Sequence, residues 1–236
     1  MAESSEDIRK EHIRDLGGEL GAVYHALWRE VVWLHAKWIG TANFTPRHRS
    51  TFPLLKKVAN DFFGVLRNAL SEDVVLHAAR LTDPSETGRG RRAQDNLTRR
   101  RLPALVDHAL LRDEPQVRVN AAAKACETLK ALRDKWIAHR DLNLALETSS
   151  SPLPGIAFEE LESALEAIRA VMNRLEVHYS LPEVGYQYVS SIGSDADSLI
   201  YYLRKGVGAE KRQMERLRAG KPLPEDLEPE DEGGNE

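Results

Sequence analysis

Residues 20–38, LGAVYHALWREVVWLHAKW, carry the clearest periodic pattern in the 236-residue chain. Six apolar side chains recur there at alternating spacings of four and three residues: Leu20, Tyr24, Leu27, Val31, Leu34 and Trp38. These spacings place all six on one stripe of an α-helix that buries its apolar side. Trp28, Trp33 and His35 fall beside or off the stripe and widen the aromatic surface of the helix. The stretch therefore predicts a long core helix that packs against several neighbours in a bundle.

The rest of the chain also favours helices, and no stretch shows a convincing strand pattern or an internal repeat. Further helices are expected over about residues 5–16, 50–66, 71–81, 97–111, 115–136, 161–179 and 194–205. Ser71 precedes two acids and is expected to cap a short helix, because acids in a first turn complement the helix dipole. Asp83-Pro84 is expected to stop that helix, and Pro103 disturbs the start of the next one. The sequence thus predicts an all-α bundle with additional helices.

Composition excludes several classes of protein. Apolar residues make up 42% and charged residues 30% of the chain, which is typical of a globular protein with a real core. The single Cys126 cannot form an internal disulfide and fits a reducing compartment. No run of about 18 apolar residues and no apolar N-terminal signal is present, so we expect a cytoplasmic protein without membrane contact. The histidines show no zinc-ligand spacing and no glycine-rich phosphate loop occurs, so neither a metal nor another cofactor is expected.

Charge is distributed unevenly along the chain. Residues 221–236 carry one lysine and seven acids, a net charge of -6, whereas the whole chain carries -4, which leaves +2 on the other residues. A polar, acidic end of this kind is expected to be disordered. The predicted organisation is a helical N-terminal extension (1–16), a helical domain (17–206), a charged helical extension (207–219) and a disordered acidic tail (220–236).

Residues 132–142, LRDKWIAHRDL, form one of the densest groups of chemically active side chains in the sequence. In a regular α-helix of about 100° per residue, Arg133 and Arg140 project within about 20° of each other, while His139 lies about 120° from Arg133. The three side chains therefore do not share one narrow face. Either the helix ends or distorts near His139, or a second copy of the chain completes a site across a twofold axis.

Arg133, followed by the polar Asp134 and separated from His139 by five residues, resembles the R-x(4 to 6)-H motif of the HEPN superfamily. Together with residues 79–84, ARLTDP, and the pair Asn96-Leu97, the segment is similar to the AbiU-type HEPN family of phage abortive-infection proteins. The resemblance implies a HEPN-like antiparallel helical bundle that is usually dimeric. Many such proteins cut RNA without a metal, and the Arg and His groups of two protomers face each other.

The resemblance covers about residues 15–205 and implies roles for particular side chains. His139 is expected to take a proton from a ribose 2′-hydroxyl or give one to the leaving 5′-oxygen, Arg133 to hold the phosphate, and Asp134 to orient one of them. Further RNA contacts are expected from Lys135, Arg140, Arg99 and Arg100. The last two belong to a run of six arginines in thirteen residues, which a solvated loop or a partner for the acidic tail would explain equally well. Many active members carry Asn where this chain has Asp134, whose negative charge opposes a phosphate.

These features lead to one functional hypothesis and one alternative. The first is a metal-independent endoribonuclease that acts as a homodimer on RNA, in phage defence or as a toxin, with a composite site between the protomers. An antitoxin or another defence protein is a further expected partner. The alternative is a non-catalytic helical module that dimerises, or binds a nucleotide or a protein, through the same segment.

Overall fold

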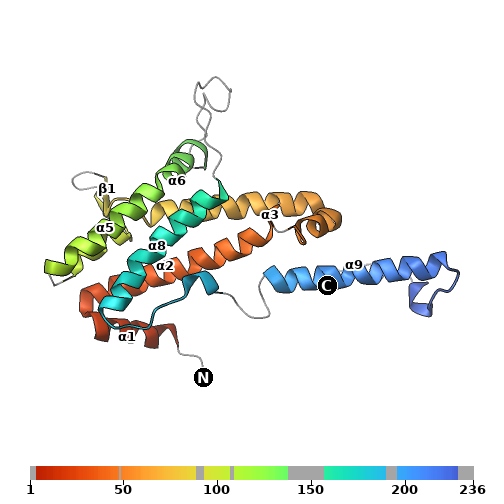
Figure 1. Cartoon of the computed structure of the whole chain (residues 1–236), viewed down its shortest axis with the longest axis horizontal. Coiled ribbons are helices and arrows are strands. Elements are labelled where there is room, and N and C mark those ends of the chain that lie inside the picture. Colours follow the sequence, from red (N-terminus) through yellow and green to blue (C-terminus); the bar gives the residue numbers. More distant parts are fainter. Residues whose placement is uncertain are drawn as a thin grey trace, which may run out of the picture. The chain divides into compact units, whose positions relative to one another are not determined.

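The computed structural model describes residues 4–47, 49–88, 93–106, 109–137, 157–189 and 196–227. Within these ranges the backbone is helical apart from turns and two short antiparallel strands, β1 (Glu86–Thr87) and β2 (Gln94–Asp95), as Figure 1 shows. The predicted all-α fold class is therefore confirmed. The chain forms two compact units, one of residues 1–41 and 66–190 and the other of residues 42–65 and 191–236.

The first unit holds most of the helices. Its elements are α1 (Ser5–Leu16), nearly all of α2 (Gly18–Asn43), the second half of α3 (Phe52–Arg80), the 3₁₀ turn η2 (Arg99–Arg101), α4 (Leu102–Leu105), α5 (Ala109–Ala125), α6 (Glu127–Leu132), the π-helical turn η3 (Arg133–Ile137), α8 (Phe158–His178) and the 3₁₀ turn η4 (Tyr186–Tyr188). α5 packs along α8. The predicted helices over 5–16, 20–38 and 161–179 correspond to α1, α2 and α8.

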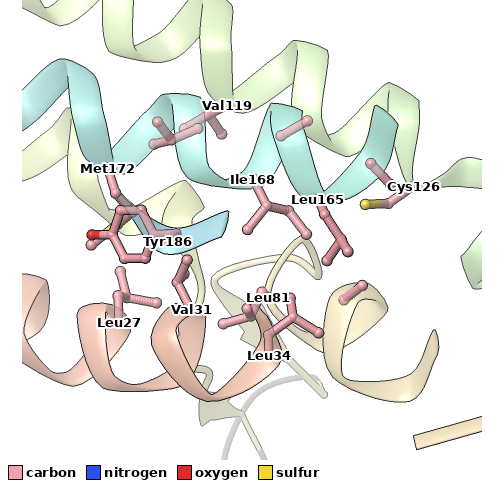
Figure 2. Packing of buried hydrophobic residues seen from close by; sticks show 14 of the residues in the cluster. Leu27, Val31, Leu34, Leu81, Val119, Cys126, Leu165, Ile168, Met172 and Tyr186 are labelled. Atoms are coloured by element: carbon pink, nitrogen blue, oxygen red, sulfur yellow. The ribbon is translucent and has the colours of Figure 1, made fainter. Parts of the chain in front are cut away.

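The stripe predicted on α2 is buried throughout. Leu27, Val31 and Leu34 have no exposed surface, and Figure 2 shows them facing Ile168 and Met172 of α8 across the core. Burial of each apolar side chain of this size contributes about 1.5–3 kcal/mol. The stripe therefore holds α2 in the centre of the first unit.

The predicted break between two helices near Ser71 is wrong. Residues 52–80 form one helix, α3, which passes through Ser71 and bends at Ala59, whose φ of -159° and ψ of 73° are non-helical. The helix continues beyond Ser71 because Val74, Val75 and Ala78 are buried in the core. That packing outweighs a cap signal worth about 1 kcal/mol.

Residues 97–111 do not form the single helix that we expected. α4 ends at Leu105, and α5 begins at Ala109 and continues through Pro115, where a separate helix was expected to begin. Pro103 lies in the first turn of α4, where the missing proline N–H leaves no helical bond unmade. The helix expected as far as residue 136 is interrupted at Cys126, after which α6 and η3 follow.

α1 packs closely against α2. The two helices are joined by Gly17, whose φ of 87° favours glycine. A Cβ atom on Gly21 would lie 2.4 Å from the backbone oxygen of His12, so the close approach requires glycine there. His12 and His25 face each other with their Nδ1 atoms 3.1 Å apart, and burial lowers the pKa of both rings. α1 is therefore a packed part of the first unit.

A buried carboxylate links α8 to α2 and η4. Glu176 is fully buried, and its Oε1 accepts hydrogen bonds from the hydroxyls of Tyr24 and Tyr186, each at 2.7 Å. The backbone N–H of Val184 donates to Oε2 at 2.9 Å. Burial is the main cause that raises the pKa of both tyrosines, so their hydroxyls remain proton donors. A polar network satisfied in this way rigidifies the core around it.

The second unit contains the first part of α3, α9 (Ala196–Arg218) and η5 (Pro224–Asp226). Phe44 and Phe63 pack with their ring centroids 5.8 Å apart, and Ile200 of α9 is buried. Lys57 of α3 contacts Glu210 of α9 at 3.2 Å. α9 is one uninterrupted helix across position 206, the predicted boundary between the helical domain and the charged extension. None of the described helices is long and apolar enough to cross a membrane.

Candidate functional site

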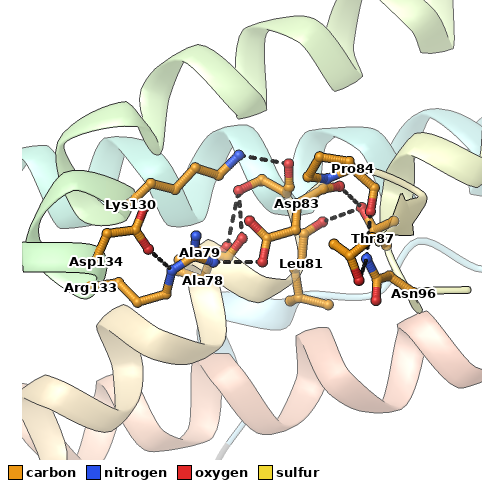
Figure 3. A network of polar contacts seen from close by, with 12 residues as sticks. Ala78, Ala79, Leu81, Asp83, Pro84, Thr87, Asn96, Lys130, Arg133 and Asp134 are labelled. Atoms are coloured by element: carbon orange, nitrogen blue, oxygen red, sulfur yellow. Dashed lines mark hydrogen bonds and ion pairs between the residues drawn. The ribbon is translucent and has the colours of Figure 1, made fainter. Parts of the chain in front are cut away.

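Residues 79–84 and 132–137, from the two segments that carry the family resemblance, lie side by side in the first unit. Arg133, at the start of η3, reaches Asp83, in the turn after α3, with Nη1 2.5 Å from Oδ2 (Figure 3). Its Nε donates to Oδ1 of the adjacent Asp134 at 2.7 Å. Two carboxylates therefore hold the guanidinium, and the Arg133 side chain keeps 21% of its surface exposed.

The backbone at Arg133 is not a regular α-helix. Residues 133–137 form a π-helical turn, in which each hydrogen bond spans five residues. The helix is therefore distorted within residues 133–137, and the angles of a regular α-helix do not apply to this turn. Such turns occur frequently at functional sites. His139 and Arg140 lie outside the described residues.

The backbone around Asp83 is fixed by hydrogen bonds from three side chains, those of Thr98, Lys130 and Arg100. The hydroxyl of Thr98 donates to the Asp83 carbonyl oxygen at 2.8 Å. Lys130 Nζ donates to the Thr82 carbonyl oxygen at 2.7 Å, and Arg100 Nε donates to the same oxygen at 3.2 Å. The turn therefore presents the Asp83 carboxylate in a fixed position.

The surroundings shift the pKa values of two cations of this cluster, Arg133 and Lys130, in opposite directions. The hydrogen bond with Asp134, and then that with Asp83, raises the pKa of Arg133, so its guanidinium stays charged. Burial lowers the pKa of Lys130, and Asp83 acts in the opposite direction. Lys135 is exposed. Nε and Nη1 of Arg133 make the two carboxylate contacts, and Nη2 takes no part in them.

The position of Arg99 corrects the expectation that this residue contacts RNA. Its side chain is 1% exposed, and its Nε donates to the Leu81 carbonyl oxygen at 3.3 Å. Burial lowers the pKa of Arg99 to about 10, and Nη1 and Nη2 find no hydrogen-bond partner among the described residues. Arg99 therefore fills the interior beneath the turn, whereas the neighbouring Arg100 is exposed.

Sequence reasoning missed two members of the cluster, Asp83 and Lys130. It assigns Asp83 to a helix stop and to the family segment 79–84 but not to the site, because the partner of this carboxylate lies fifty positions further along the chain. Lys130 lies three residues before Arg133, a spacing that places helical side chains on one side. The spacing could therefore have indicated Lys130 as a member of the site. For Asp83 the sequence offers only its place in the family segment 79–84.

The cluster around Arg133 joins guanidinium and ammonium donors to two carboxylates and a backbone carbonyl. Within the ranges that the structure describes, no group of three or more His, Cys, Asp or Glu side chains is placed to hold a metal ion. What this arrangement can do chemically is bind an anionic group through guanidinium and ammonium donors.

Comparison with known protein families covers both parts of the chain that form this cluster, the turn at Asp83 and the segment from Arg133. The model of the AbiU2 family of HEPN domains matches residues 18–191, a range that contains Asp83, Arg133 and His139. The chain belongs to the AbiU2 HEPN family. The resemblance indicated by residues 79–84 and 132–142 is thereby confirmed. No curated protein and no solved structure gives a significant match.

Asp83→Asn is expected to lower the free energy of unfolding of this AbiU2-family protein by about 1–3 kcal/mol, because Arg133 loses a charged, partly buried partner. Asp134→Asn is the matched control, since it contacts the same guanidinium from a side chain that is 60% exposed. A loss below about 1 kcal/mol is expected for it. Urea unfolding followed by circular dichroism measures both variants. Equal losses would contradict the structural importance assigned to Asp83.

Proposed function

We propose that this AbiU2-family protein is a metal-independent endoribonuclease that works as a homodimer, in phage defence or as a toxin. The observation that carries the proposal is the anchored, partly buried guanidinium of Arg133, six positions before His139 in the segment that the family model matches. Asp83 and Asp134 restrict its orientation. A guanidinium restricted in this way is suited to bind one phosphate in one geometry.

The proposed reaction uses the nucleophile that RNA itself supplies. His139 accepts the proton of a ribose 2′-hydroxyl, the 2′-oxygen attacks the adjacent phosphorus, and the bond between phosphorus and the 5′-oxygen breaks. The departing 5′-oxygen takes a proton from a second, protonated imidazole. Arg133 binds the non-bridging oxygens, on which negative charge grows. The products are a 2′,3′-cyclic phosphate end and a 5′-hydroxyl end.

A homodimer follows from this chemistry, because the reaction needs one neutral and one protonated imidazole and the motif supplies one His139 per chain. The second imidazole is His139 of the partner subunit. Lys135, Arg140 and Arg100 are the remaining candidates for contacts with the RNA backbone. Action in the cytoplasm and control by an antitoxin or another defence protein belong to the same proposal.

A non-catalytic interaction module is the second candidate. It is favoured by one observation, the pairing of Arg133 with both Asp83 and Asp134, which offsets the positive charge that a phosphate would need. In that case the segment around η3 joins two chains or binds a protein or a nucleotide, and RNA is not cut.

The test is incubation of the purified full chain with a defined RNA oligonucleotide in EDTA, beside its 2′-deoxy counterpart and an identically purified His139→Ala protein. We expect the wild type to cut the RNA, to leave cyclic phosphate ends and to leave the 2′-deoxy strand intact. Cutting of the 2′-deoxy strand, or equal rates for the wild type and His139→Ala, overturns the proposal. No cutting by a dimeric wild type favours the interaction module.

A further inference from the structure

α9 has a defined inner side within the second unit. Ile200 is buried, and Glu210 and Arg204 contact Lys57 and Ser50 around the start of α3, each at 3.2 Å. At about 100° per residue, these three α9 positions fall within about 120° of one another. The opposite side of the helix is therefore its outer face.

The outer face carries an aromatic ring between basic groups. Tyr201, Lys205 and Arg212 lie within about 40° of one another, roughly 130° from the middle of the inner side. All three are exposed, Tyr201 to 54%. Lys205 Nζ lies 5.4 Å from the centroid of the Tyr201 ring. α9 thus carries an aromatic ring and two cations on the same side.

The acids of α9 leave the helix with a net positive charge, and Asp197 lies one helical turn before Tyr201. The helix has six basic and three acidic residues, a net charge of +3. Glu210 faces Lys57 on the inner side, and Glu215 lies 3.9 Å from Lys211. Arg216 pairs with Asp226 of η5 and is therefore not counted as part of the outer face.

We propose that Tyr201, Lys205 and Arg212 form a binding surface for single-stranded RNA, which rests on RNA being the substrate of the proposed nuclease. An exposed aromatic ring stacks on a base of any identity, and flanking cations contact the phosphates on either side. A helix that binds a membrane surface inserts its apolar side, and the apolar positions of α9, Ile200 among them, lie away from the outer face. The outer face instead offers one aromatic ring and two positive charges.

Binding is measured by the fluorescence anisotropy of a labelled oligouridylate with the full chain carrying His139→Ala, so that cleavage plays no part. Lys205→Gln combined with Arg212→Gln is expected to weaken binding about tenfold or more. The slope of log affinity against log salt is expected to fall by about 1.4, because each phosphate contact with a single strand contributes about 0.7. Tyr201→Ala is expected to weaken binding about tenfold without changing that slope.

Lys10→Gln combined with Lys124→Gln is the matched control, since it removes the same charge from exposed positions of the first unit. We expect it to change neither the affinity nor the slope. Equal binding before and after the α9 substitutions overturns the inference, even if the wild type cuts RNA. Weakened binding by the α9 variants supports it, even if no RNA is cut. Binding to vesicles of anionic phospholipid without binding to RNA also overturns it.

Discussion

Replacement of Arg133 by alanine is expected to reduce the rate of RNA cleavage by about 10²–10³-fold, because a fixed donor aimed at the growing phosphate charge is worth that much. His139→Ala is expected to reduce the rate by about 10²–10⁴-fold through loss of proton transfer. Initial rates on a defined RNA oligonucleotide in EDTA measure both effects. Circular dichroism of each variant controls for loss of the helical fold.

Arg133→Lys separates the charge of this residue from its shape. Lysine keeps the positive charge but lacks the planar fork that reaches Asp83 and Asp134 at the same time. We therefore expect Arg133→Lys to recover only a small part of the activity lost in Arg133→Ala. Cleavage by Arg133→Lys at the wild-type rate would contradict the need for an oriented guanidinium.

Mixed dimers test whether one reaction uses both chains. When equal amounts of wild-type and His139→Ala chains are co-expressed, about a quarter of the dimers carry two copies of His139. If each reaction needs both imidazoles, activity falls to about a quarter of the wild-type value, whereas independent sites would retain about a half. Activity measured over a series of mixing ratios distinguishes a squared dependence on the wild-type fraction from a linear one. A linear dependence would contradict the composite site.

The sequence predicts those parts of the fold whose signal is local. The stripe on α2 repeats within residues 20–38, so its spacing alone identifies the buried side of the helix. At Ser71 local reasoning fails, because the burial of Val74 and Val75 against other elements carries α3 past an apparent cap. Local patterns therefore locate helices, but tertiary packing decides where a helix ends.

The candidate site shows the same limit. The family motif identifies Arg133 because its residues lie close together in the sequence, whereas Asp83 joins it from fifty positions away. Arg99 and Arg100 are adjacent, yet the first is buried and the second is exposed. The packing of η2 beneath the turn decides which of these two arginines can contact RNA. No local pattern in an arginine-rich stretch predicts that packing.

Acidification from about pH 7 to about pH 4 is expected to lower the free energy of unfolding by about 3 kcal/mol through His35 alone. His35 is 2% exposed, and its burial, with a smaller effect of Arg169 and Arg99, lowers its pKa from 6.5 to about 4. Its Nδ1 lies 2.9 Å from the Val31 carbonyl oxygen, and Nε2 has no hydrogen-bond partner among the described residues. Protonation would therefore place a second, unpaired N–H in the core.

The direction of this effect follows from the two pKa values. Between about pH 6.5 and pH 4 the unfolded chain binds a proton at His35 and the folded chain does not, so stability falls as the pH falls through this range. His35→Gln cannot titrate and is expected to lose about 3 kcal/mol less than the wild type over the same range. Urea unfolding followed by tryptophan fluorescence, which reports on Trp28 and Trp38 of α2, measures both proteins. Carboxylates that titrate near pH 4 affect both equally, so parallel pH curves would contradict a depressed pKa at His35.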